Sequence, residues 1–208
     1  MAENSVVASY TAYVVDMNLE RREVFETVRA RTGTATALYP GSFIHIAPSY
    51  YFQNVVYIDR QHAAVQFFAD EQDVLDYVRG RKHYKQQPYI RFIEQDYTTP
   101  LPLRENSYDL LIALYATGAA EACHAYLKSG GLLLSNNHHD DAGQALRSGD
   151  YDLVAAMFYD GDTCQITGTD LEQYFVPKPR RSRKKHSQLD STSPEYTHNA
   201  DYYLLKKR

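Results

Sequence analysis

The 208-residue chain has no tryptophan, only two cysteines, and no apolar run near the roughly 20 residues that span a bilayer. Cys123 and Cys164 are too few for a disulfide framework, and neither belongs to a C-x-x-C or Cys/His cluster. The first ten residues lack a basic stretch followed by an apolar one, the pattern of a secretory signal. We therefore expect a cytoplasmic protein that does not cross a membrane and has no zinc site.

The chain also lacks a positive excess, because its formal net charge is −4. Six of its 22 Lys and Arg residues lie in one run at 178–186, so the remainder is strongly acidic. We predict a flexible basic loop at 177–199, whose few apolar residues cannot bury enough surface to order it. Binding of nucleic acid through Lys178–Lys185 stays open but is not favoured, since a broad basic face is missing.

Hydrophobic periodicity divides the rest of the chain into alternating strands and helices. Residues 1–16 are expected to form a loose N-terminal arm with a short strand, and residues 17–208 a single domain. Gly130-Gly131 is expected to form a turn. Strands are predicted at 34–39, 54–59, 89–96, 108–116, 132–136, 151–159 and 201–206, and helices at 18–32 (capped by Asn18 and ended by Gly33), 61–85, 119–128 and 169–175.

This alternation predicts parallel βαβ units and a three-layer α/β fold. In such folds ligands bind beyond the carboxyl ends of the strands. The chemically interesting strand ends are those that carry a glycine turn, an acid or histidines: 39–41, 59–60, 96–97, 115–117 and 136–139.

Several of these features together resemble a class I S-adenosylmethionine (SAM)-dependent methyltransferase. They are the turn at Gly41, acids at Asp59 and Asp96 after successive strands, the apolar run YDLLIALYA, and the segment AYLKSGGLLLSNN at 125–137. The resemblance implies a Rossmann-like three-layer sandwich with a mostly parallel seven-stranded sheet and an antiparallel last strand. It also implies SAM as cofactor.

The resemblance further implies roles for individual residues. Asp59 would bind both ribose hydroxyls and Asp96 the adenine amino group. Tyr97 or Ile58 would lie near the adenine ring. The turn under the methionine end and the neighbouring strand ends complete the implied cofactor-binding set: Tyr39, Pro40, Gly41, Ser42 and Arg60.

The implied chemistry falls on three residues. Tyr115 would form a wall of the cleft, and His138 or His139 would act as a general base toward an oxygen nucleophile. The alternative for each histidine is a solvated loop side chain, and His45 is a weaker candidate. The segment SNNHHDD also resembles part of a magnesium site, but Ala116 and Thr117 stand where such methyltransferases carry an acid, so we predict no metal.

The sequence departs from the family pattern at its first motif, which has one glycine where two or three are usual. Ser129 stands where proline is common, and LYATG replaces the Asn-Pro-Pro-Tyr motif of enzymes that methylate base amino groups. The interpretation we favour is methyl transfer from SAM to an unidentified acceptor. The alternative is a catalytically inactive, methyltransferase-like binding or scaffold protein. The sequence identifies neither the acceptor nor the oligomeric state.

Overall fold

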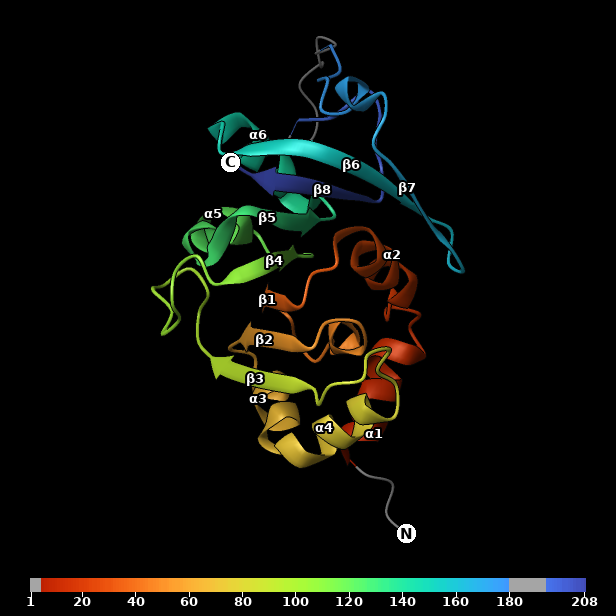
Figure 1. The fold of residues 1–208 in the computed structure, drawn as a ribbon, viewed down its shortest axis with the longest axis vertical. Coiled ribbons are helices and arrows are strands. Elements are labelled where there is room, and N and C mark those ends of the chain that lie inside the picture. Colours follow the sequence, from red (N-terminus) through yellow and green to blue (C-terminus); the bar gives the residue numbers. More distant parts are fainter. Residues whose placement is uncertain (1–4, 180–193) are drawn as a thin grey trace, which may run out of the picture.

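The computed structural model describes residues 5–179 and 194–208, which build one eight-stranded sheet in the order β3-β2-β1-β4-β5-β8-β6-β7. Figure 1 shows the strands stacked in this order from β3 upward. Strands β1 to β5 pair in parallel, β8 is antiparallel to both of its neighbours, and β7 is antiparallel to β6. The strands are β1 (Thr36–Pro40), β2 (Asn54–Asp59), β3 (Tyr89–Glu94), β4 (Tyr108–Ala113), β5 (Leu127–Ser135), β6 (Tyr151–Tyr159), β7 (Cys164–Thr167) and β8 (Tyr202–Lys207).

Helices cover both faces of this sheet. The α-helices are α1 (Ser5–Tyr10), α2 (Arg22–Thr32), α3 (His62–Ala69), α4 (Glu71–Arg79), α5 (Ala119–Ala122) and α6 (Asp141–Ser148). A π-helical segment, η1 (Thr11–Val15), extends α1. Short 3-10 turns are η2 (Ala47–Tyr50), η3 (His124–Tyr126), η4 (His138–Asp140) and η5 (Leu171–Gln173).

The central strand β4 shows why the layers form. Side chains alternate between the faces of a strand, so Leu110 and Ile112 enter the core shared with α1 to α4. Leu111 and Ala113 enter the opposite core, shared with α5 and α6. The predicted three-layer α/β fold with an antiparallel last strand is therefore confirmed. The predicted strand number was one too low, because β7 is a four-residue edge strand of mixed polarity.

The N-terminal segment differs from the predicted loose arm with a short strand. Residues 5–15 are helical, and Val6, Tyr10 and Val14 are buried in the core. Tyr10 lies edge-on to Tyr77 of α4, with ring centroids 5.1 Å apart. The helix forms because α4 supplies an apolar surface that the local sequence does not reveal.

The boundaries of three further elements also differ from the prediction. Helix α2 starts at Arg22, after Arg21 in a left-handed conformation, so Asn18 is not its cap, whereas Gly33 does end it. The predicted 61–85 helix is two helices, separated at Asp70, whose side chain accepts a bond from the Asp73 amide. The predicted 169–175 helix is only the turn η5.

The strand β5 passes through Gly130-Gly131 instead of starting after a turn there. Leu127 pairs with Tyr108, and the register then shifts before Leu132 pairs with Leu110. The glycines are thus part of a bulged strand that pairing with β4 stabilises. Strand β3, in contrast, ends at Glu94, which leaves Asp96 in the following turn.

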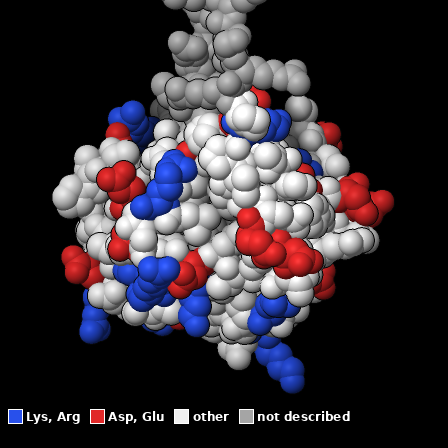
Figure 2. Space-filling model, turned by 90° about the horizontal axis from the view of Figure 1, so that it is seen from above, with Lys and Arg blue, Asp and Glu red and all other residues white. Residues whose placement is uncertain are grey.

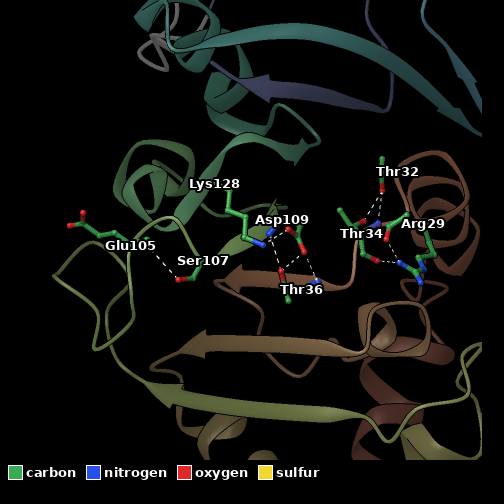
Figure 3. Close-up of polar contacts among 9 residues, drawn as sticks. Arg29, Thr32, Thr34, Thr36, Glu105, Ser107, Asp109 and Lys128 are labelled. Carbon is green, nitrogen blue, oxygen red and sulfur yellow. Dashed lines mark hydrogen bonds and ion pairs between the residues drawn. The ribbon is translucent and has the colours of Figure 1, made fainter.

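A polar network ties the strands together at their amino-terminal edge (Figure 3). The Asp109 carboxylate accepts bonds from the Thr36 amide at 3.2 Å and the Thr36 hydroxyl at 2.5 Å, and it pairs with Lys128 Nζ at 2.6 Å. These side chains join β1, β4 and the start of β5. Asp109 therefore has a structural role, at the edge opposite to the strand ends where a ligand is expected.

The surface carries charges of both signs. On the face in Figure 2, basic and acidic side chains lie among wide uncharged areas, and no area is covered by basic side chains alone. Most of the predicted basic loop at 177–199 lies outside the described residues; at its described ends, Lys178 pairs with Glu195 at 3.7 Å. Within residues 5–179 and 194–208, no helix has the length and apolarity to cross a bilayer.

Candidate functional site

The turn after β1 is held against the tip of β2. Gly41 has a left-handed backbone (φ 64°), and its amide donates to the Ile58 carbonyl at 2.8 Å. A Cβ atom at this position would lie 2.9 Å from the Cβ of Ala116 and 3.4 Å from a Tyr97 ring carbon. Both the conformation and the close approach of the β4 loop therefore require glycine here.

Asp59, at the end of β2, is only 5% exposed. Its Oδ2 accepts a bond from the Phe43 amide at 2.7 Å, and its Oδ1 accepts one from the Gln61 amide at 2.8 Å. The carboxylate thus joins the Gly41 turn to the start of α3. A carboxylate offers about four acceptor positions, so two remain beyond these amides.

The residues after β3 form an exposed cluster with the residue after β2. Arg60 pairs with Asp96 at 3.0 Å. The amide and then the hydroxyl of Thr98 bond to Asp96 and lower the pKa of its carboxyl group. Tyr97 donates from its hydroxyl to the Thr117 carbonyl at 3.0 Å. The fold therefore brings Arg60, Asp96 and Tyr97 to the same edge of the sheet as Gly41.

Tyr39, Pro40 and Ser42 lie beneath this edge, not on its surface, since all three are buried. The Tyr39 hydroxyl is 3.0 Å from His45 Nδ1, and His45 Nε2 is 2.9 Å from the Glu20 carbonyl oxygen. A carbonyl only accepts, so Nε2 carries the proton and Nδ1 accepts from Tyr39. His45 therefore links the N-terminal segment to β1, and burial lowers its pKa to about 4.

A cavity of about 570 Å³ opens at the carboxyl ends of β4 and β5. Two of the three predicted catalytic residues, Tyr115 and His138, belong to its wall. His139 is not in the wall, although its ring centroid lies 4.0 Å from that of His138. The full lining is Arg21, Tyr115, Asn136, His138, Tyr159, Asp160, Gly161, Ala200, Asp201 and Tyr202.

Tyr115 is held in a strained position on this wall. Its backbone is left-handed (φ 56°), which is unusual for a bulky side chain, and the side chain is exposed. The Tyr115 amide donates to Asn136 Oδ1 at 3.2 Å, and the Tyr115 ring lies 5.1 Å from that of His138. Such strain persists where surrounding structure enforces it and is frequent at binding and catalytic sites.

His138 has the properties of a neutral imidazole at neutral pH. Partial burial, and secondly the neighbouring His139, lower the pKa of His138. Its amide is 3.4 Å from Asn136 Oδ1, so Asn136 contacts the two predicted catalytic residues that lie in the cavity wall, Tyr115 and His138. A neutral imidazole beside a cavity can accept a proton.

The acid that ends η4 has a structural role. Asp140 is 4% exposed and accepts bonds from the Tyr196 hydroxyl at 2.6 Å and from Arg147 Nη2 at 2.5 Å. Among the described residues, no group of three or more His, Cys, Asp or Glu side chains is arranged to hold a metal ion. Asp140 of the SNNHHDD segment thus holds the start of α6 in place through its bonds to Arg147 and Tyr196.

Asp141, at the start of α6, predicts a pH dependence of stability. It is 5% exposed, its Oδ2 has no hydrogen-bond partner among the residues that the structure describes, and burial raises its pKa to about 6 from 3.8. Between these values the folded state keeps a proton that the unfolded state has lost, so the free energy of unfolding falls as pH rises from about 4 to 7. We expect Asp141→Asn to be about 2 to 3 kcal/mol more stable than wild type at pH 8 and nearly equal to it at pH 4, measured by urea denaturation. An equal difference at both pH values would contradict the raised pKa.

The sequence did not indicate most of the cavity wall. Arg21 precedes α2, Tyr159 ends β6 and is followed by Asp160, and Asp201 directly precedes β8, which begins at Tyr202. No motif marks them, because they meet only when β8 inserts between β5 and β6. Asn136 belongs to the predicted strand end at 136–139, although no role was predicted for its side chain.

Comparison with known proteins rests on structure alone, because no protein-family model and no curated protein matches the chain. A methyltransferase from Geobacter sulfurreducens superposes with a TM-score of 0.52 at 12% identity, covering 100% of this chain and 91% of that one. A SAM-dependent methyltransferase from Thermotoga maritima superposes with a TM-score of 0.50 at 9% identity, covering 97% and 99%. A Staphylococcus aureus protein provisionally assigned as a caffeoyl-CoA O-methyltransferase gives 0.53 at 12% identity, covering 99% and 93%.

The superpositions with these neighbours cover nearly the whole chain. At such low identity the likeness establishes architecture and not chemistry. The chain has the class I fold of the SAM-dependent methyltransferases.

Proposed function

We propose that this protein transfers a methyl group from SAM to a small acceptor bound in the 570 Å³ cavity. The observation that carries the proposal is a continuous edge of the sheet. Tyr115 of the cavity wall is followed by Ala116, which packs against Gly41, and Gly41 in turn is bonded to the tip of β2 next to Asp59. The predicted cofactor residues and the predicted catalytic residues thus adjoin one another.

The residues at this edge suit an adenosyl ligand by chemical type. Asp59 keeps acceptor positions for two hydroxyl groups, and Asp96 supplies a carboxylate one strand further along. Because Asp59 is 5% exposed beneath Phe43, ligand entry would require the turn at 41–43 to move away from it. When bound, SAM supplies a methyl group on a positively charged sulfur.

The chain would then contribute positioning and a base. Holding the acceptor in the cavity replaces an encounter in solution by a fixed approach, which is the main requirement of this reaction. The neutral His138 ring would take the proton of an acceptor hydroxyl. Asn136 would hold Tyr115 and His138 in place, because its side-chain Oδ1 accepts hydrogen bonds from the backbone amides of both residues.

Calorimetric titration with SAM and with S-adenosylhomocysteine tests the cofactor site. We expect micromolar binding by the wild-type protein and roughly 10- to 100-fold weaker binding by Asp59→Asn, because an amide replaces a carboxylate that accepts hydroxyl bonds. The matched control is Asp109→Asn, which removes a bonded strand carboxylate at the opposite edge of the sheet. Its affinity should equal that of the wild type.

If Asp59→Asn and Asp109→Asn weaken SAM binding equally, Asp59 is not part of the cofactor site. No heat at millimolar SAM from a folded wild-type protein would overturn the proposal. The second candidate function, a binding protein without turnover, would then hold. One observation favours it. Both oxygens of the buried Asp59 already accept hydrogen bonds from backbone amides, so the chain itself takes two of the acceptor positions on the carboxylate that would bind ribose.

A further inference from the structure

The cavity at β4 and β5 carries three charged side chains on its wall, and their bonding differs. Asp160 accepts bonds from the amides of Asp162 and Thr163 and from the Thr163 hydroxyl, at 3.1, 2.7 and 3.0 Å. Asp201 accepts a bond from the Tyr159 amide at 2.8 Å. Both acids thus have structural roles in closing the β6–β7 hairpin and joining it to β8.

Arg21 has no comparable explanation. Within the part of the chain that the structure describes, it forms no ion pair, and its guanidinium lies over the Tyr159 ring, 4.8 Å from the centroid. The contact with the ring and a hydrogen bond to the Tyr159 hydroxyl hold the guanidinium in place, and its five N–H groups leave further donors for a ligand. The left-handed backbone of Arg21 (φ 53°) is a further strained feature next to this cavity.

The rest of the wall suits a flat ligand with polar groups. Tyr115, Tyr159 and Tyr202 contribute rings from three separate elements, and Asn136 and His138 contribute polar groups from the end of β5. The cavity volume lies within the range of about 300 to 1,000 Å³ that is usual for small-molecule sites. A planar guanidinium matches a carboxylate, which it can bind through two parallel hydrogen bonds.

We propose that the acceptor in this cavity is an aromatic carboxylate, and that Arg21 binds its carboxylate group while the ring lies among the tyrosines. This inference names the substrate class and rests on the proposed methyl transfer for its biological meaning. Arg21 would be a specificity-determining residue: it selects the acceptor by charge, at the wall formed by α2 and β6.

The test uses three probes of one shape and different charge, titrated without SAM: 4-hydroxybenzoate, the neutral 4-hydroxybenzamide and the cationic 4-hydroxybenzylamine. We expect wild-type protein to bind the benzoate about tenfold more tightly than the amide, and the amine most weakly, because the guanidinium bonds only to the anion with full charge assistance. Arg21→Gln should bind benzoate and amide equally, and Arg21→Lys should keep a preference of about threefold.

The matched control is Arg81→Gln. Arg81 also lies over a tyrosine ring, that of Tyr77 at 3.6 Å, but is not in the cavity wall, so its loss should leave the tenfold preference intact. Thermal unfolding of each variant verifies that it is folded. Any of four results would overturn the inference. The wild type could bind benzoate and amide equally, bind the amine most tightly, or bind no probe at millimolar concentration. The fourth is a preference for benzoate that survives Arg21→Gln.

The outcome is separable from that of the SAM titration. A benzoate preference that depends on Arg21, in a protein that does not bind SAM, would keep the carboxylate site and reject methyl transfer. SAM binding together with indifference to probe charge would reject the carboxylate site alone.

Discussion

Gly41→Ala should lower the free energy of unfolding by about 2 to 5 kcal/mol. The left-handed backbone at φ 64° costs a residue with a Cβ atom roughly 1 to 2 kcal/mol. The new methyl group would also lie 2.9 Å from the Ala116 Cβ, inside normal contact distance, and such overpacking costs about 1 to 3 kcal/mol. Urea denaturation with an unchanged m-value measures the sum.

Gly33→Ala isolates the conformational part of this cost. Gly33 ends α2 with nearly the same φ of 65°, but no atom lies within 4 Å of the position of its Cβ. Gly33→Ala should therefore lower the free energy of unfolding by only about 1 kcal/mol. The double variant Gly41→Ala/Ala116→Gly should show a favourable coupling of about 1 to 2 kcal/mol, because removing the Ala116 methyl group relieves the contact. Equal losses at Gly33 and Gly41, without coupling, would contradict the close packing of the turn against the β4 loop.

His45→Phe should cost about 2 to 3 kcal/mol at pH 7. The ring volume is kept, but the Tyr39 hydroxyl and the Glu20 carbonyl lose their partner in a largely buried place. The penalty should fall as the pH is lowered. Between pH 6.5 and about 4 the unfolded wild type binds a proton at His45 that the folded state does not, so wild-type stability decreases by up to about 3 kcal/mol.

Guanidinium denaturation of both proteins from pH 7 to pH 4 measures this convergence. The phenylalanine variant has no group to titrate at this position, so its stability should lack that decrease. His62→Gln, an exposed change in the first turn of α3, serves as control and should alter stability by less than about 0.5 kcal/mol at either pH. A constant difference between wild type and His45→Phe would show that the pKa of His45 is the same in the folded and unfolded states, against the lowering that burial is expected to cause.

The turn at Gly41 also shows how much of the fold local sequence patterns can predict. Glycine at position 41 and an acid at the end of the next β-rich run predicted a turn and a strand tip at one edge, because strands in this fold are parallel and end together. The strand at 108–113 was predictable for a similar reason: an apolar run without alternation indicates a strand covered on both faces.

Other features could not be read locally because they depend on surfaces supplied by distant segments. Residues 5–15 are helical because Tyr10 packs against Tyr77 of α4. Strand β7 forms because it pairs with residues 156–159 of β6. The role of His45 was also hidden. It was a weak candidate base by its position in a loop, and its two bonds to Tyr39 and Glu20 are contacts across the fold.

Apolar periodicity and the residues that end each strand by themselves determined the α/β fold and the edge at which Gly41, Asp59, Asp96, Tyr115 and His138 gather. These depend on interactions within a few residues or on a rule common to parallel sheets. Only the tertiary structure decided that Asp59 is buried under its own loop and that Arg21, Tyr159 and Asp201 complete one cavity. The physical reason is that burial and the meeting of side chains are set by packing between α2, β6 and β8, which no single stretch of sequence contains.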